Sequence, residues 1–196
     1  EANKLTGLFV SSGAILQVKE SSGVIRTLRD ARARQIWKKS MAVMVDRYSA
    51  SASEIFAGAI QDYQRGIVIG QKTFGKGTVQ KLDRLSSGQI KITESKFYRI
   101  TGAGMQNKGI HPDIKLPSAW DTDEIGESSY DSALPWDEIK PVPFQKFSKL
   151  SSIISLLNDK HLIRVNKSPD LQYILDLRKR YEIQKDKKVI SLNLAN

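Results

Sequence analysis

The chain has 196 residues, a net charge of +10 and no cysteine. Its 40% hydrophobic and 27% charged residues are typical of a globular protein and exclude a disordered polyelectrolyte or a fibrous repeat. The lack of cysteine excludes a disulfide framework, a zinc site with cysteine ligands and a thiol nucleophile. No apolar run approaches the roughly 18–20 residues needed to cross a bilayer, so we expect no integral membrane segment.

The first half of the chain predicts a hairpin followed by a strand, a helix and a second strand. Apolar residues within 14–18 and 24–28 flank the turn signal Ser-Ser-Gly at 21–23. The run 41–45 is too short for a helix and predicts a strand buried on both faces. Apolar residues then recur at helical spacing from Ser51 to Tyr63, ahead of a second buried run at 67–69. This order implies a right-handed crossover between two parallel strands.

The second half predicts a glycine-containing loop, further strands and a helical end. We expect the loop at 70–77, strands at 78–82 and 89–100, a short strand near Leu116, and helices at 150–157 and 171–181. Ser168-Pro169-Asp170 predicts the start of the second helix, by a capping serine followed by proline. Residues 118–138 carry seven acidic residues and neither Lys nor Arg, a composition typical of a linker. We therefore divide the chain into an α/β core over 1–118, a linker over 119–145 and a small, mostly helical region over 146–196.

The positive charge is concentrated at the C-terminal end. Residues 141–196 hold 11 Lys and Arg against 5 Asp and Glu. Such a density usually marks a solvated helix face, and no nucleic-acid-binding motif accompanies it, so we expect no nucleic-acid partner. The alternative, nucleic-acid binding by this basic tail, predicts an affinity that falls steeply with salt.

The segment Ser49-Ala50-Ser51-Ala52-Ser53-Glu54 lies where the buried strand turns into the helix. A side chain at such a junction lies beside free backbone N–H groups and the positive end of a helix dipole, which can stabilise an oxyanion. Ser51 and Glu54 also match a helix capping box, which needs no catalytic role. A shift of one residue in the start of the helix would change which serine caps it. The three serines therefore cannot be ranked as candidate nucleophiles from the position of the helix alone.

A serine nucleophile needs a base, and the two histidines are poor candidates. His161 lies in the C-terminal region, and His111 lies in a strand-edge loop beside Pro112. The alternative base is a lysine in dry surroundings, for which Lys76 is the best candidate because its neighbours Gly75 and Gly77 allow close backbone approach. The competing interpretation of Lys76 is a solvated loop lysine.

The stretch SASASEIFAGAIQDYQRGIVIGQKTFGKGTVQ, residues 49–80, resembles the catalytic signature of the C-terminal processing peptidases, the S41 serine peptidases. Residues 90–117, LPWDEIKPVPF at 134–144, LQYILDLRKRY and KKVISLNL resemble the tail-specific protease branch of that family. The resemblance implies a crotonase/ClpP-like protease core with a mixed curved sheet.

Carried over by position, the resemblance implies Ser51 as nucleophile, Lys76 as general base and Gln80 as the residue that supports the lysine. The backbone N–H of Ala52 becomes one oxyanion donor. Ser51 attacks, Lys76 takes and returns the proton, and neither a metal nor a cofactor is required.

The resemblance also implies a periplasmic endopeptidase that recognises proteins by apolar, unstructured C-terminal tails. The family's glycine-rich second oxyanion segment and its PDZ domain are not found in these residues, so we expect residues 1–196 alone to be catalytically crippled. An exposed sheet edge predicts self-association. The runner-up function is a non-catalytic scaffold that has the protease fold and binds a peptide or protein partner.

Overall fold

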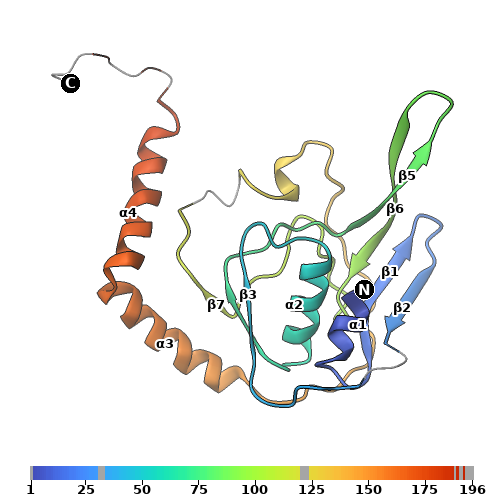
Figure 1. Ribbon diagram of the computed structural model, residues 1–196, viewed down its shortest axis with the longest axis horizontal. Coiled ribbons are helices and arrows are strands. Elements are labelled where there is room, and N and C mark those ends of the chain that lie inside the picture. The colour runs from blue at the N-terminus through green and yellow to red at the C-terminus, as the bar shows by residue number, and fades with distance from the viewer. Residues whose placement is uncertain (1, 31–33, 120–123, 188, 190–191, 193–196) are drawn as a thin grey trace.

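The computed structural model describes residues 2–30, 34–119, 124–187, 189 and 192. Within these residues, strands form two sheets with a central helix between them (Figure 1). The antiparallel sheet has the order β2-β1-β6-β5 and contains β1 (Ala14–Glu20), β2 (Ile25–Arg29), β5 (Thr78–Arg84) and β6 (Gln89–Tyr98). The parallel sheet has the order β3-β4-β7 and contains β3 (Ala42–Val45), β4 (Ile67–Gly70) and β7 (Ile114–Lys115). The helices are α1 (Ala2–Gly7), α2 (Ala52–Asp62), η1 (Glu127–Ser129), α3 (Ser151–Lys167) and α4 (Pro169–Gln184).

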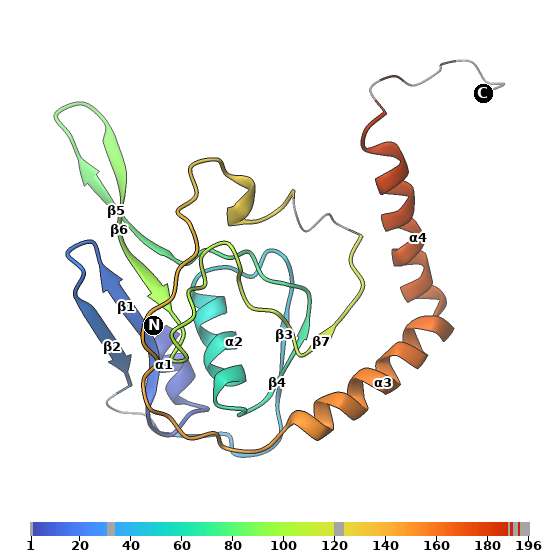
Figure 2. The same ribbon diagram turned by 180° about the vertical axis from the view of Figure 1, so that it is seen from behind.

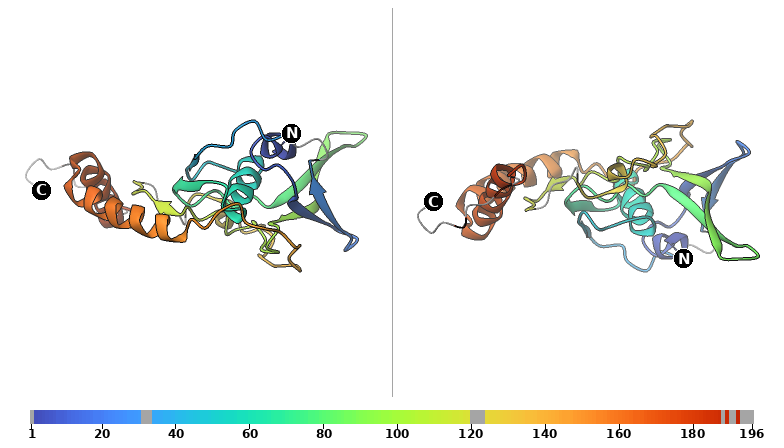
Figure 3. Two further views of the ribbon diagram at one scale, coloured as in Figure 1. Left: turned by 90° about the horizontal axis from the view of Figure 1, so that it is seen from below. Right: turned by 90° about the horizontal axis from the view of Figure 1, so that it is seen from above.

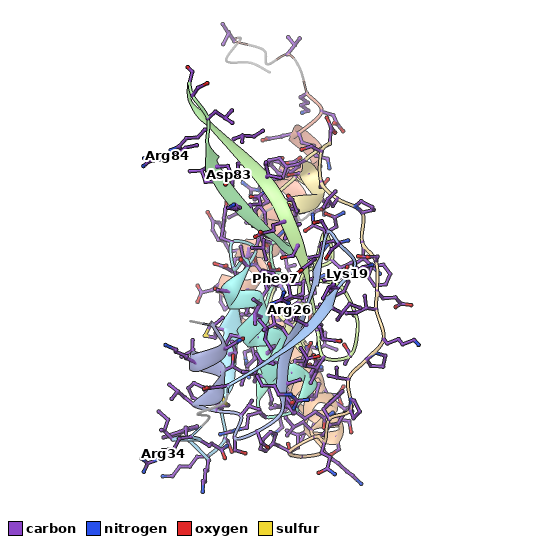
Figure 4. All side chains as sticks on the ribbon, turned by 90° about the vertical axis from the view of Figure 1, so that its right-hand side faces the viewer. Lys19, Arg26, Arg34, Asp83, Arg84 and Phe97 are labelled. Carbon is purple, nitrogen blue, oxygen red and sulfur yellow. The ribbon has the colours of Figure 1, made fainter. Side chains whose placement is uncertain are left out.

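The predicted N-terminal hairpin is confirmed. Strands β1 and β2 pair in antiparallel register, with Leu16 opposite Leu28 and Lys19 opposite Ile25. The second hairpin, β5–β6, is also antiparallel and extends beyond the body of the molecule (Figure 1). Viewed from the side, Asp83 and Arg84 lie toward the far end of β5–β6, while Lys19 and Arg26 lie on the β1–β2 hairpin (Figure 4).

The predicted β3–α2–β4 crossover is confirmed, since β3 and β4 pair in parallel with Val43 opposite Val68. The prediction that 41–45 is buried on both faces is wrong. Strand β3 lies at the edge of its sheet, and Met44 is 77% exposed. The apolar run marks a strand correctly, but a sequence run cannot distinguish a central strand from an edge strand.

Helix α2 forms the centre of the core because it contacts both sheets. One cluster joins Ile55 of α2 to Leu16 of β1 and Val68 of β4. Small residues at 57–59 let the surrounding chain approach closely, since a Cβ at Gly58 would lie 3.1 Å from the Ile110 Cδ1 atom. Burying this helix between two sheets fixes both of its ends, including the N-terminal end at which Ser51 lies.

The C-terminal helices lead away from the core, as Figures 1 and 2 show. The predicted helix start at 168–170 is confirmed: Ser168 caps α4 by accepting from the Leu171 N–H, with Pro169 in the first turn. Helix α3 contacts the core at β7, where Asn158 donates to the Asp113 carbonyl. The two hairpins and these helices lie at opposite ends of the molecule (Figure 3).

The described part of the 119–145 segment runs along the core. Trp136 Nε1 donates to the Gly104 carbonyl at 2.9 Å. The Tyr98 hydroxyl donates to both carboxylate oxygens of Asp137, and Lys96 forms an ion pair with it. The division into core, linker and helical region stays a prediction, but this part of the linker is held by specific contacts.

None of the described helices is both long and apolar enough to span a membrane.

Asp137 makes the attachment of this segment sensitive to acid. Partial burial acts to raise the pKa of Asp137, but hydrogen bonds from Lys96 and Tyr98 and the charges of Lys96 and Lys19 outweigh it, so the pKa lies below the ordinary value of 3.8. A carboxyl group with a lowered folded-state pKa stabilises the fold above the unfolded pKa and loses that contribution as the pH falls through the folded pKa.

We predict that Asp137→Asn lowers the free energy of unfolding at pH 6 by about 0.5–1 kcal/mol, a small value because the side chain is 39% exposed. The difference from wild type should shrink as the pH falls below 3.8, because protonation of the Asp137 carboxyl in the unfolded state then favours unfolding of the wild type. Urea unfolding of the wild type and of Asp137→Asn at pH 6 and at pH 3 measures this difference in the free energy of unfolding. A difference that stays constant or grows in acid would contradict this role of Asp137.

Candidate active site

The turn that carries the serines begins at the carboxyl end of β3. The Asp46 carboxylate accepts hydrogen bonds from the N–H of Tyr48, the N–H of Ser49 and the hydroxyl of Ser49. The Asp46 N–H in turn donates to the Ser49 hydroxyl at 3.1 Å. The Ser49 hydroxyl is therefore used to build the turn, which favours the other two serines as nucleophile.

Ser51 has a backbone conformation that a non-glycine residue rarely adopts. As the N-cap of α2 it has φ 54° and ψ −108°. Such a conformation costs of order 1–3 kcal/mol and persists only where the surroundings enforce it. A serine on a sharp strand-to-helix turn is also the arrangement of the nucleophile elbow in α/β-hydrolases. Ser53, two residues later, is exposed in the first turn of α2.

The buried Glu54 carboxylate connects the serine turn to the lysine loop, residues 73–77. One carboxylate oxygen accepts from the Ser51 N–H at 2.8 Å and from the Lys76 N–H at 2.9 Å. The other accepts from the Thr73 hydroxyl at 2.5 Å and from the Gly75 N–H at 2.7 Å. One side chain thus fixes the backbones of the candidate nucleophile and the candidate base relative to each other.

The environment of Glu54 is strongly desolvated. The residue is fully buried. Burial raises the pKa of Glu54, while the hydrogen bonds from Thr73, Gly75, Ser51 and Lys76 oppose that rise. All four partners donate to Glu54. Two acceptor oxygens are therefore needed, which a carboxylate has and a side-chain amide, with one oxygen and one NH2 group, does not.

The lysine loop has further backbone contacts that set its path. The Phe74 N–H donates to the Ser49 carbonyl at 3.0 Å, a second direct link to the serine turn. A Cβ at Gly77 would lie 2.4 Å from the Gln106 backbone nitrogen. The predicted close approach beside Lys76 is therefore observed, and its partner is the segment around residue 106.

Lys76 and Gln80 line one cavity of about 490 Å³ together with Ala50. Lys76 is half-buried, and Gln80 is exposed on β5. Ser51 itself is not among the residues that line this cavity. Within the described residues no hydrogen bond joins the Ser51 side chain to the Lys76 ammonium group, so the structure brings the two together through their backbones.

The Ala52 N–H lies in the first turn of α2, where N–H groups lack an intrahelical acceptor. Ala52 is exposed, so an oxyanion can approach this donor and the positive end of the helix dipole.

The two histidines take no part in this arrangement. His111 is exposed, and His161 is buried where α3 meets β7, with Nε2 3.2 Å from the Lys115 carbonyl oxygen. Within the described part of the chain, no group of three or more His, Asp or Glu side chains is placed to hold a metal ion.

The clamping role of Glu54 was not predicted from the sequence, nor were the contacts of Thr73, Gln106 and Glu127. The Gly77 N–H donates to Gln106 Oε1, and Gln106 Nε2 donates to Glu127 Oε1. Glu54 carried a signal, since it follows Ser51 by three residues, but the capping-box pattern predicts only its bond to the Ser51 N–H. Its bonds to the lysine loop depend on tertiary structure. The other three residues show no local pattern that could have identified them.

Comparison with known proteins shows the family of the chain. The profile of peptidase family S41 matches residues 1–116. The chain belongs to peptidase family S41. Residues 120–196 match the C-terminal domain of tail specific protease, which is the branch that the sequence resemblance indicated.

Individual relatives support the same assignment. The chain is 42% identical over 205 residues to the tail-specific protease of Haemophilus influenzae, covering 98% of this chain and 30% of that protein. The photosystem II D1 C-terminal processing protease superposes with a TM-score of 0.54 at 32% identity, over 59% of this chain and 30% of that chain. A lipoprotein of Streptococcus agalactiae shares the fold, with a TM-score of 0.50 at 16% identity over 59% of this chain and 46% of that chain. The α/β protease fold predicted from the sequence is confirmed.

The S41 chain described here spans 24–30% of the length of the curated relatives it matches.

We predict that Glu54→Gln lowers the free energy of unfolding by about 2–4 kcal/mol, because the amide NH2 group faces buried donors that then lack an acceptor. Chemical unfolding of residues 1–196 measures the loss. The matched control is Glu138→Gln, which removes an exposed carboxylate and should change stability by less than about 0.5 kcal/mol. Equal effects of the two substitutions would show that Glu54 does not clamp the loop.

Proposed function

We propose that the whole protein is a serine endopeptidase in which Ser51 is the nucleophile and Lys76 the general base. The main support for this proposal is the strained backbone of Ser51, together with the Glu54 carboxylate, which accepts hydrogen bonds from the N–H groups of both Ser51 and Lys76. Membership of family S41 supports the reaction class. Gln80 lines the same cavity as Lys76 and is assigned to support the lysine.

The proposed reaction runs through an acyl-enzyme. The Ser51 oxygen bonds to the carbonyl carbon of the substrate as Lys76 takes the hydroxyl proton. The C–N bond then breaks, and Lys76 delivers that proton to the leaving amine. Water attacks the ester, gives a proton to Lys76, and the proton returns to Ser51 as the acid leaves. The Ala52 N–H stabilises the oxyanion in both steps.

We further propose that the substrates are proteins with apolar, unstructured C-terminal tails and that the whole protein acts in the periplasm. Tail specificity is supported by the match of residues 120–196 and by the Haemophilus influenzae relative, a protein named for it. The apolar character of the tails and the periplasmic location are supported by the family resemblance of the sequence alone.

Residues 1–196 alone are proposed to be nearly inactive. Only one backbone oxyanion donor, at Ala52, is assigned in this chain, and loss of one such donor costs roughly 10²- to 10³-fold in rate.

Among the described residues, β3 is an edge strand of its sheet, and its exposed Met44 supports self-association of this chain. Sedimentation velocity tests this point, and a sedimentation coefficient independent of concentration would contradict it.

The central test uses an extended chain, with residues 1–196 preceded by further sequence to the length of the Haemophilus influenzae relative. The substrate is an unfolded protein with an apolar C-terminus. The extended wild type should cleave it. Ser51→Ala should lower kcat/KM by at least about 10⁴-fold, and Lys76→Ala by about 10²- to 10⁴-fold.

Ser53→Ala is the matched control for Ser51, since it removes a neighbouring exposed hydroxyl and should leave cleavage unchanged. An unfolded substrate protein with a polar C-terminal tail serves as the control for substrate specificity. Loss of cleavage in Ser53→Ala but not in Ser51→Ala would overturn the assignment. No cleavage by the extended wild type would instead favour a non-catalytic scaffold that binds peptides.

A further inference from the structure

The acidic segment after β7 contacts the lysine loop directly. The Glu127 N–H donates to the Phe74 carbonyl at 2.9 Å. Gly126 packs on the guanidinium of Arg47, where a Cβ would lie 2.2 Å from Arg47 Nη2, and its φ is +133°. Arg47 is itself fully buried and donates to the Thr73 carbonyl. This segment, matched to the C-terminal domain of tail specific protease, therefore reaches the Thr73–Phe74 end of the lysine loop.

A side-chain relay makes a second connection on the other side of Lys76. The Gly77 N–H donates to Gln106 Oε1 at 2.9 Å, and Gln106 Nε2 donates to Glu127 Oε1 at 3.2 Å. The direction of the relay is fixed by chemistry, since a backbone N–H can only donate and an ionised carboxylate can only accept. Gln106 is 1% exposed, so the relay has no ready substitute from water.

The same segment forms a wall of the cavity that contains Lys76. Glu127, Tyr130, Ala133 and Leu134 line it together with Phe74 and Lys76 of the lysine loop. Asn107 fixes this wall by donating to the Leu134 carbonyl at 3.0 Å. Nearby, the Lys108 ammonium lies over the Trp136 ring, 3.2 Å from its centroid. The wall is thus anchored along residues 104–108, the strip that the lysine loop also contacts.

We propose that Glu127 is a positioning residue for the peptidase reaction, acting through Gln106 on the backbone beside Lys76. This inference rests on the proposed function of Ser51 and Lys76. Glu54 holds the loop from the side of the serine turn, and Glu127 holds it from the side of the acidic segment. Without the second contact, Lys76 shifts relative to Ser51, and misplacement by about 1 Å can cost roughly 10²-fold in rate.

The test is an exchange of the two side chains in the extended chain. Gln106→Glu places a second carboxylate against Glu127 with no donor between them, and we expect kcat to fall about 10- to 100-fold with KM within about twofold. Adding Glu127→Gln restores a donor facing the carboxylate introduced at position 106, while that carboxylate still accepts from Gly77. The double variant should recover most of the lost kcat.

Two measurements keep the test decisive if Gln106→Glu fails to fold. Glu127→Ala leaves the buried site otherwise intact and should lower kcat with little change in KM, whereas Glu138→Ala, on the same segment, should not. In residues 1–196, Glu127→Ala should also speed amide exchange at Gly77 at least about 10-fold, relative to the β4 amides.

Failure of this inference is distinct from failure of the proposed function. If the extended wild type cleaves, Ser51→Ala does not, and Glu127→Ala retains full kcat, then Glu127 has no positioning role. A double variant no better than Gln106→Glu would also overturn the inference. An inactive wild type, or an active Ser51→Ala, would overturn the peptidase assignment and the inference with it.

Discussion

The arrangement of this site depends on one buried carboxylate. Glu54 is fully buried, and its two oxygens accept hydrogen bonds from Ser51, Thr73, Gly75 and Lys76. Leaving these donors unpaired in the interior is costly, so the serine turn and the lysine loop cannot separate without a large free-energy penalty. The same bonds hold Ser51 at its positive φ. Strain at the candidate nucleophile is thus maintained by hydrogen bonds at a residue three positions further along α2.

The fold supports this carboxylate by placing two strand ends side by side. Strands β3 and β4 are parallel and adjacent, so the turn after one and the loop after the other leave the same edge of the sheet. Helix α2 is buried between the two sheets, which keeps Glu54 in place. The acidic segment then closes the arrangement from outside through Glu127. A region that composition alone describes as a linker therefore contributes contacts to the site.

The sequence predicted most of the elements because their signals are local. The β1–β2 turn, the α2 periodicity and the Ser168-Pro169 helix start each depend on a few neighbouring residues, and each is confirmed. The exposure of Met44 could not be predicted, because it depends on the position of β3 at the edge of its sheet, and an apolar run does not indicate the order of the strands. Ser51 and Lys76 were found by motif, and their roles stay predictions. The bonds from Glu54 to the lysine loop and the relay through Gln106 join residues 19–29 positions apart, and no local sequence pattern predicts such contacts.

The most direct test of the account is to trap the nucleophile covalently. The extended chain would be treated with a fluorophosphonate, digested, and mapped by mass spectrometry, alongside the Lys76→Ala variant. We predict a single phosphonyl adduct on Ser51, formed at least about 100-fold more slowly in Lys76→Ala because the general base is absent. An adduct on Ser49 or Ser53, or equal rates with and without Lys76, would contradict the account.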